Sequence, residues 1–214
     1  MHNVLVRTYG QYCAVAKALD VVGDRWTLLI IRELLLRGAC RYTDLRDGLP
    51  GIATNLLADR LRDLEEAALV AREEAPPPIA TTLFRLTERG AQLAPVLKAL
   101  GAWGAPLMEK AQRDEEFRGH WLALPVATYL RDHTPDRPPV SIQVNVADEA
   151  VVVETADGTV RARPGTAPDP DVTLTGAPPV VIGLFVGRLS LAQARTRGLR
   201  VEGGVGALRR LGIS

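Results

Sequence analysis

The sequence predicts an α+β protein in two domains, and three observations support this prediction. Up to about residue 112, apolar residues recur mainly at helical spacing, interrupted by two short runs with strand character. From residue 121 onward, alternating and β-branched runs come first and apolar helices follow them. Between the two patterns, residues 113–119 form a charge-rich junction. We therefore predict one domain over residues 1–112 and a second over residues 121–214.

Composition narrows the class of protein further. With 47% hydrophobic and 24% charged residues the chain is an ordinary globular sequence, and it contains no apolar run long enough to span a membrane. We find no secretory leader in the first residues and expect a cytoplasmic protein. The cysteines, Cys13 and Cys40, are too few for a disulfide framework, and no His/Cys spacing indicates a metal site. We expect two free thiols and no metal or cofactor.

An enzyme is the least favoured class. The three histidines, His2, His120 and His133, are scattered and adjoin no nucleophile or carboxylate pair, and no Gly-rich phosphate loop follows a strand. The charge also limits the possible partners, because residues 1–112 hold 14 Lys and Arg against 13 Asp and Glu. Since phosphate neutralisation supplies most non-specific affinity for nucleic acid, any DNA binding must rely on local clusters of arginine.

The first domain is organised around residues 38–66. A short amphipathic segment ends in a turn over residues 48–51, where Gly and Pro break the helical pattern, and a second helix follows. The first segment has three apolar positions, Tyr42, Leu45 and Leu49. The second helix has one apolar stripe, Leu57, Leu61 and Leu64. Small and amide side chains begin its polar face, as in a recognition helix of a helix-turn-helix; an ordinary two-helix corner is the alternative.

The flanking sequence favours the helix-turn-helix. Before it, residues 11–22 form a helix with an apolar face of Val15, Ala18, Leu19 and Val22, and Asp24 is a suitable N-cap for a mostly buried helix over residues 26–36. After it, the strand-like runs 69–74 and 82–86 flank a Pro-rich loop, which predicts a β-hairpin wing. The order of elements is that of a winged helix.

A long helix is predicted after the cap residue Thr87. Its apolar positions recur at spacings of 3, 4, 3 and 4, which is a heptad seam. The seam consists of Leu93, Val96, Leu100, Trp103 and Leu107. A second copy of the chain is the expected partner, and packing against the N-terminal helix of the same chain is the alternative. Pro95 lies inside the segment and predicts a kink.

The second domain is predicted to be an antiparallel sheet with helices on one side. A helix over residues 121–130 precedes a strictly alternating strand, 140–146. Strands 151–155 and 159–163 flank Asp157-Gly158, a strong hairpin signal, and are followed by strands 171–175 and 199–201. The expected helices cover 179–187, 191–197 and 205–211, with a capping box of Ser190 and Gln193 at the second.

Residues 13–103 resemble the HxlR-type winged-helix regulators of bacteria. The resemblance is carried by residues 18–30, 41–45, 49–52, 61–66 and 86–90, together with Leu93, Pro95, Leu100 and Trp103. It implies a homodimer, paired through its N- and C-terminal helices, that represses or activates transcription at an inverted-repeat operator. Some similar proteins use a thiol at the position of Cys13 as a redox switch. A buried Cys13 in a dimerising helix is the alternative that we favour.

Residues 140–211 are similar, less specifically, to the sterol-carrier-protein-2 (SCP2) fold. The matching segments are 171–175, the apolar helix after it, and 199–203. The resemblance implies an apolar tunnel for a lipid-like molecule. We expect a largely apolar ligand between the sheet and the helix 179–187, contacting Val181, Leu184 and Phe185. An ordinary packed core is the alternative.

The sequence departs from the winged-helix family at three places. Ala53 stands where a Ser usually caps the recognition helix, which costs about 1 kcal/mol. Ala68 stands where Gly is usual, so a left-handed backbone there is strained. Glu73 and Glu74 lie on the wing, and no basic residue lies between Ala75 and Thr81. These carboxylates disfavour phosphate contacts by the wing but do not disturb the fold.

We predict a DNA-binding transcriptional regulator that senses an apolar small molecule. Thr54, Asn55, Asp59 and Arg60 are the expected contacts on the recognition helix, and Arg41 and Arg46 are the expected phosphate contacts. The expected partners are double-stranded DNA, a second copy of the chain and the apolar effector, with no membrane. Two other functions stay open: a lipid or small-molecule carrier with vestigial DNA binding, and a thiol-based redox regulator acting through Cys13.

Overall fold

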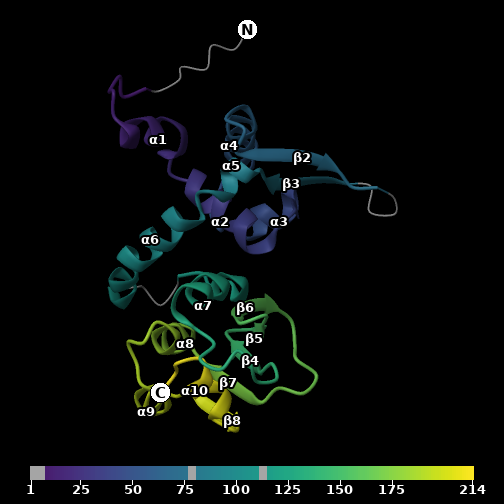
Figure 1. The fold of residues 1–214 in the computed structure, drawn as a ribbon. Coiled ribbons are helices and arrows are strands. Elements are labelled where there is room, and N and C mark those ends of the chain that lie inside the picture. The colour runs from purple at the N-terminus through teal and green to yellow at the C-terminus, as the bar shows by residue number, and fades with distance from the viewer. Residues whose placement is uncertain (1–7, 77–80, 111–114) are drawn as a thin grey trace. The chain divides into compact units, whose positions relative to one another are not determined.

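The computed structural model describes residues 8–76, 81–110 and 115–214, and it divides into two compact units. Unit 1 is Met1–Ala99 and unit 2 is Leu100–Ser214 (Figure 1). Residues 111–114, which include part of the predicted junction, lie outside the described residues. The predicted domain boundaries at residues 112 and 121 therefore remain a prediction.

Unit 1 contains the predicted order of helices and strands. Its helices are α1 (Ala14–Val22), α2 (Thr27–Arg37), α3 (Tyr42–Asp47), α4 (Thr54–Glu66), α5 (Glu88–Ala91) and the start of α6 (Ala94–Gly104). Its strands are β1 (Cys40–Arg41), β2 (Val70–Glu74) and β3 (Thr82–Leu86), in the sheet order β1-β3-β2. The hairpin of β2 and β3 is the predicted wing. Strand β1 was not predicted, because two residues are too few to show an alternating pattern.

The core of unit 1 is built from the apolar faces that the sequence indicated. From α2, Ile30 and Ile31 are fully buried, and Leu45 of α3 is buried beside them. The stripe Leu57, Leu61 and Leu64 on α4 is buried as predicted. This stripe holds one side of α4 against the core and leaves its other side to solvent.

One predicted feature at the start of unit 1 is wrong, the N-cap of α2. Helix α2 begins at Thr27 with Trp26 as its N-cap, so Asp24 is not the cap; its carboxylate pairs with Arg60 instead. The predicted apolar face of α1 is largely exposed, with Val15 67% and Leu19 43% accessible. Only one position of that face, Val22, is buried in the single chain.

The single long helix predicted after Thr87 is divided into three pieces. Thr87 caps α5, whose last turn ends at Gln92, and α6 starts two residues later. Pro95 cannot donate a backbone hydrogen bond, so it ends the preceding helix and is tolerated at the second position of the new one. Beyond α6, a 3-10 helix η1 (Ala105–Lys110) contains Leu107, so the last seam position is not on an α-helix.

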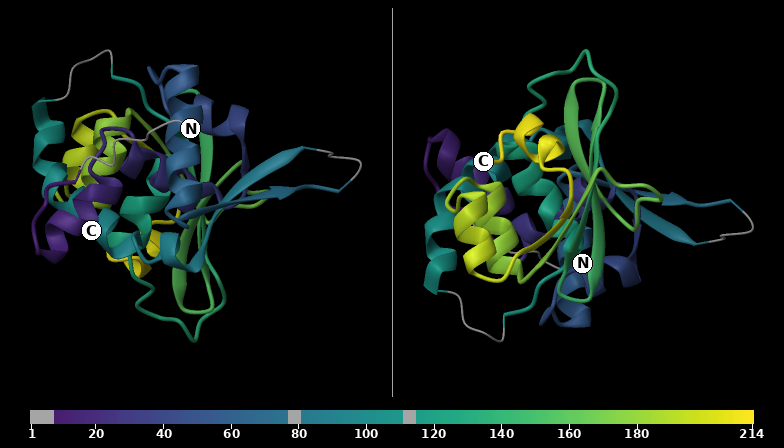
Figure 2. Two further views of the ribbon diagram at one scale, coloured as in Figure 1. Left: turned by 90° about the horizontal axis from the view of Figure 1, so that it is seen from above. Right: turned by 90° about the horizontal axis from the view of Figure 1, so that it is seen from below.

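Unit 2 has a five-stranded sheet and several helices. The strands are β4 (Ser141–Val146), β5 (Glu149–Ala156), β6 (Thr159–Pro164), β7 (Val172–Gly176) and β8 (Arg200–Gly203), in the order β6-β5-β4-β7-β8. The helices are η2 (Gly119–Leu122), α7 (Ala123–Tyr129), α8 (Pro178–Phe185), α9 (Leu191–Thr196) and α10 (Gly206–Arg210). They lie on one side of the green strands in Figure 2, as predicted.

The sheet is mixed and not wholly antiparallel, which corrects the prediction. Strand β7 runs parallel to β4, while the other neighbouring pairs are antiparallel. The reason is that residues 165–171 connect β6, at one edge of the sheet, to β7 on the other side of β4, so that β7 runs in the same direction as β4. This loop is held on the sheet by Gln143, whose Oε1 accepts the N–H of Ala167 at 2.8 Å, and by Asp171, which accepts the N–H of Ser141 at 2.8 Å.

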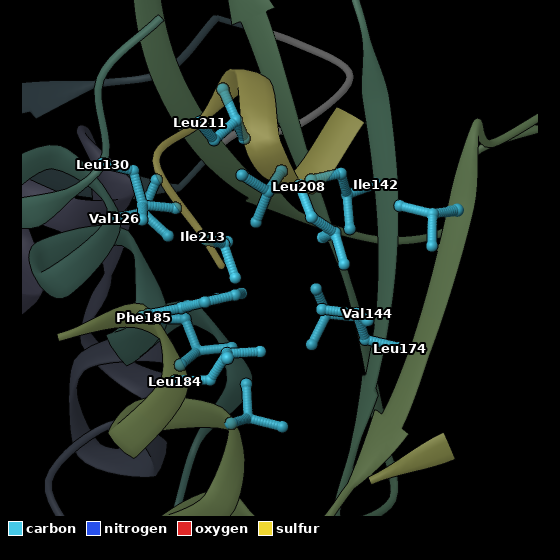
Figure 3. Packing of buried hydrophobic residues seen from close by; sticks show 14 of the residues in the cluster. Val126, Leu130, Ile142, Val144, Leu174, Leu184, Phe185, Leu208, Leu211 and Ile213 are labelled. Atoms are coloured by element: carbon cyan, nitrogen blue, oxygen red, sulfur yellow. The ribbon is translucent and has the colours of Figure 1, made fainter. Parts of the chain in front are cut away.

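The core of unit 2 lies between the sheet and its helices (Figure 3). Ile142, Val144 and Leu174 project from β4 and β7, and Leu184 and Phe185 face them from α8. The predicted hairpin turn is also present, since Asp157 and Gly158 both have positive φ. Ser190 and Gln193 form the predicted capping box.

Candidate nucleic-acid interface

The first turn of α4 is presented by the turn before it. Ala53 has an extended backbone and provides no side-chain cap, as its methyl group requires, and Gly51 adopts the positive φ that the turn needs. The Tyr42 hydroxyl donates a hydrogen bond of 2.6 Å to the Thr54 carbonyl, which joins α3 to the first residue of α4. The end of α4 is also as expected, because Ala68 has a left-handed φ of 55°.

The structure brings together Thr54 and Asn55, both exposed on the first turn of α4. Further along the helix, the predicted contacts are engaged within the protein. Asp59 pairs with Arg62, and the Arg60 guanidinium pairs with Asp24 and lies 2.9 Å from Asp63. Short polar side chains near a helix N-terminus are therefore available for base edges, whereas Arg60 would have to leave its carboxylate partners.

The two predicted phosphate contacts flank α3. Arg41 is exposed directly before the helix, where its backbone N–H donates to the Asp44 carboxylate at 3.0 Å. Its guanidinium forms no ion pair with any residue that the structure describes. Arg46 is exposed on the last turn of α3, and its Nε lies 3.9 Å from the Asp47 carboxylate.

A buried carboxylate fixes the position of α3 relative to α2. Glu33 of α2 is fully buried and lies 2.7 Å from Arg32 and 3.1 Å from Arg37. Arg32 also donates to the carbonyl of Gly48, the residue that ends α3. Sequence reasoning missed this cluster, because a single Glu in an apolar helix gives no indication of its partners.

A second feature missed from the sequence is a groove on the wing, of about 460 Å³, which we call the wing groove. It is lined by residues of β1, α3, β2 and β3, among them Arg41, Tyr42, Thr43, Arg72, Thr82 and Phe84. The groove depends on the register of the hairpin, in which Arg72 is paired with Phe84 across β2 and β3, and the sequence alone does not give that register.

The predicted wing loop is partly outside the described residues, since 77–80 are not described. On the described part of the hairpin both carboxylates have partners. Glu73 lies 2.9 Å from Arg85, and Glu74 accepts a hydrogen bond of 2.7 Å from the Thr82 hydroxyl. The acidic character of the wing that the sequence indicated is therefore partly neutralised within the hairpin.

The two cysteines have opposite environments. Cys13 is exposed at the N-cap of α1, where the backbone N–H groups of Ala16 and Val15 lower the pKa of its thiol. Cys40 is buried, and desolvation raises its pKa to about 11. In the single chain α1 buries only Ala16 and Val22 and leaves Cys13 exposed; the burial of Cys13 in a dimerising helix stays a prediction.

The candidate residues for dimerisation and ligand binding contrast in their exposure. Val96, Leu100, Trp103 and Leu107 of the seam are exposed, with Trp103 72% accessible, and Leu93 is half-buried. Val181, Leu184 and Phe185 are buried in the unit 2 core, at 3% accessibility or less.

No helix in the described part of the chain is long and apolar enough to cross a membrane. Among those same residues, no group of three or more His, Cys, Asp or Glu side chains is placed to hold a metal ion. The elements of unit 1, a helix-turn-helix followed by a β-hairpin, define a winged helix-turn-helix protein.

Comparison with known proteins identifies the family. The HxlR-like helix-turn-helix profile matches residues 21–112. The chain is 34% identical to the uncharacterized HTH-type transcriptional regulator sll1512 of Synechocystis over 47% of this chain and 74% of the relative. It is 31% identical to the uncharacterized regulator YvaP of Bacillus subtilis over 46% of this chain and 90% of the relative. It is 33% identical to the regulator YodB of the same organism over 43% of this chain and 81% of the relative. The chain belongs to the HxlR-like helix-turn-helix family.

All three relatives are named as HTH-type transcriptional regulators. The protein is accordingly a transcriptional regulator of HxlR type, and these relatives support the prediction that it is not an enzyme. The family profile ends at residue 112, so it gives no family for unit 2 beyond that residue.

Proposed function

We propose that the protein is a homodimer that binds an inverted-repeat operator through α4. The observation that carries this proposal is the first turn of α4, where Thr54 and Asn55 are exposed and Thr54 is hydrogen-bonded to Tyr42 of α3. Arg41 and Arg46 are exposed at the two ends of α3. Short polar side chains at the end of an inserted helix can hydrogen-bond base edges, and guanidinium groups beside it can contact phosphates. Asp59 and Arg60 would join them by exchanging their internal ion pairs for DNA.

The test begins with selection of bound fragments from genomic DNA by the purified full-length protein. Asn55→Ala should weaken binding to a selected fragment by about 1–3 kcal/mol and leave binding to random DNA nearly unchanged. Gln92→Ala is the matched control, because it removes an exposed amide far from α4 in sequence. Equal operator affinity for Asn55→Ala and the parent would remove Asn55 from the site.

The proposal includes an apolar effector bound by unit 2 in an SCP2-like manner. The apolar character of α8 and the resemblance of residues 140–211 to that fold support it. A ligand contacting Val181, Leu184 and Phe185 must displace packed core side chains, so it would favour a different packing of α8. The ligand can change the affinity for the operator by no more than the difference between its own affinities for the two packings of α8.

Mass spectrometry of small molecules that co-purify with the full-length protein tests for the effector. The expected result is an apolar molecule in near-stoichiometric amount that shifts operator affinity when it is added back. The alternative, a carrier with vestigial DNA binding, predicts the same molecule but no selected DNA fragments.

A thiol-based redox regulator is the second candidate, favoured by the exposed Cys13 with its lowered pKa. A thiolate is the reactive form, and hydrogen peroxide would oxidise it to a sulfenate while being reduced to water. Operator binding by the parent and by Cys13→Ser is compared before and after peroxide treatment. Loss of binding only in the parent supports this role, and an identical response of both proteins excludes it.

A further inference from the structure

The boundary between the two compact units falls inside α6. Unit 1 ends at Ala99 and unit 2 begins at Leu100, so the last residues of α6 and the 3-10 helix η1 belong to unit 2. Three positions of the predicted seam, Leu100, Trp103 and Leu107, therefore lie on unit 2, and all three are exposed there. The contacts that this segment makes within unit 2 decide how these side chains are presented.

One of these contacts is with α7. An added Cβ at Gly101 would lie 3.5 Å from the Leu124 Cδ2, which is ordinary van der Waals distance, so α6 and α7 approach each other closely at this glycine. Leu124 is half-buried on α7, and α7 in turn packs against α8. The exposed part of the seam thus rests on the helices that cover the unit 2 sheet.

A second contact comes from the loop that follows α8. The Arg188 guanidinium donates a hydrogen bond of 2.8 Å to the carbonyl of Ala105, the residue directly after α6. Carbonyl groups at the C-terminal end of a helix carry partial negative charge, so a guanidinium is favoured there. Ala105 is half-buried and lies two residues after Trp103. The bond therefore restrains the chain between two positions of the seam, Trp103 and Leu107.

The backbone of Arg188 is itself held by α8. The N–H groups of Arg188 and Leu189 both donate to the Gly183 carbonyl, at 2.9 and 3.0 Å. Leu189 is buried against α8, where an added Cβ at Gly183 would lie 3.0 Å from its side chain. Leu184 and Phe185 of the same helix lie in the core of unit 2 (Figure 3). A change in the packing of α8 must therefore displace the backbone of Arg188 as well.

We propose that Arg188 is a positioning residue that couples the packing of α8 to the dimerisation seam. With α8 packed as observed, Arg188 restrains the Ala105 carbonyl and orders the segment that carries Trp103 and Leu107. A different packing of α8 withdraws the guanidinium, and the dimer then dissociates more readily because more conformational freedom is lost on association. This rests on the proposed function, since it needs a dimer held by the seam, and it names the residue through which unit 2 acts on that dimer.

Sedimentation velocity of the full-length protein over a dilution series measures the dissociation constant of the dimer. Arg188→Gln should raise this constant by about threefold to tenfold, as expected for the loss of one hydrogen bond. Arg188→Lys, which keeps a charged donor, should lie between Arg188→Gln and the parent. Arg195→Gln is the matched control, because Arg195 is an exposed arginine of α9 in the same unit, and it should dimerise like the parent.

A double-mutant cycle separates coupling through Arg188 from a merely structural role. Leu184→Ala loosens the packing of α8 and should raise the dissociation constant in the parent but have little further effect in Arg188→Gln. Leu208→Ala is the matched control, because Leu208 is buried in the same core but lies on α10. It should leave the dissociation constant nearly unchanged in both backgrounds. Circular dichroism verifies that each variant is folded, and Leu184→Met replaces Leu184→Ala if the latter is not.

Two results would overturn the coupling. One is a dissociation constant for Arg188→Gln equal to that of Arg195→Gln, and the other is an effect of Leu184→Ala of the same size in both backgrounds. If the parent is dimeric in either case, the proposed function survives and only the role of Arg188 is lost. A parent that is monomeric at every concentration would instead remove the proposed dimer and the role of Arg188 together.

Discussion

The carboxylate of Asp24, between α1 and α2, forms an ion pair with the guanidinium of Arg60 in the middle of α4. Arg60 also lies 2.9 Å from Asp63, so two carboxylates hold one arginine of the recognition helix. The pair joins the end of α1 to α4 across 36 residues of sequence. Any displacement of α1 on dimerisation would therefore act on α4 through this contact.

We expect the Asp24–Arg60 pair to contribute modestly to stability. Both side chains are partly exposed, and exposed pairs are worth about 0.2–1 kcal/mol. A double-mutant cycle of Asp24→Asn and Arg60→Gln, measured by urea unfolding, should give a coupling free energy in that range. The same cycle on Asp47→Asn and Arg46→Gln, whose charges lie 3.9 Å apart, is the control and should give less. No difference between the two cycles would contradict the role assigned to Asp24.

The second prediction concerns Gly48, which ends α3 against the buried Glu33. A Cβ at position 48 would lie 2.0 Å from the Glu33 Oε2, and that carboxylate cannot move freely because Arg32 and Arg37 hold it. Gly48→Ala should therefore lower the free energy of unfolding by about 1–3 kcal/mol. Urea unfolding followed by circular dichroism measures the change.

Gly104→Ala is the control for that substitution. Gly104 also lies at a helix end, but no atom would lie within 4 Å of an added Cβ. Alanine there should be neutral or stabilising by up to about 1 kcal/mol, since glycine is the poorer helix former. A Gly48→Ala protein as stable as the parent would show that Glu33 can adjust, and that the cluster does not fix α3.

The sequence allowed unit 1 to be predicted well where its signals are local. The stripe Leu57, Leu61 and Leu64 is periodic, so the buried side of α4 could be assigned, and the missing cap at Ala53 is a property of one residue. The partners of Asp24 and Glu33 could not be predicted, because a charged side chain gives no indication of which distant residue will face it. The wing groove was missed for the same reason, since it depends on strand register.

In unit 2 the strands could be predicted, but their pairing could not. The alternation of Ile142, Val144 and Val146 identifies a strand with one buried face, and Asp157-Gly158 joins two neighbours into a hairpin. The parallel pairing of β7 with β4 depends on where the loop 165–171 crosses, which is a long-range choice. Gln143, which holds that loop, looks in the sequence like any polar residue of an alternating strand.

The third prediction is a dependence of stability on acid pH. Arg210 binds both carboxylate oxygens of Asp132 at 2.8 Å, and this lowers the Asp132 pKa from its usual value to about 2. Because the folded-state pKa is depressed, the stabilisation is complete above the unfolded-state pKa of about 4 and is lost as the pH falls toward 2. Asp132→Asn should lower stability at neutral pH and weaken its dependence on pH in that window.

Thermal unfolding of the parent and of Asp132→Asn across this pH range measures the effect. Asp136→Asn is the matched control, because Asp136 is an exposed carboxylate four residues away in the same loop. The control should follow the parent at every pH. If Asp132→Asn shows the same acid dependence as the parent, another carboxylate is responsible.

The last prediction concerns the seam. Trp103 is 72% accessible, and Val96, Leu100 and Leu107 are also exposed, so a single chain leaves most of this apolar row in water. An aromatic side chain at the centre of an interface contributes strongly to association, and a carboxylate in its place would be buried without a partner. Trp103→Asp should therefore dissociate the proposed dimer at micromolar concentration, as measured by light scattering. Tyr129→Asp, at an exposed aromatic residue of α7, is the control and should remain dimeric. If Trp103→Asp is as dimeric as the parent, the seam does not hold two copies together, and the two recognition helices need another interface to reach an inverted repeat.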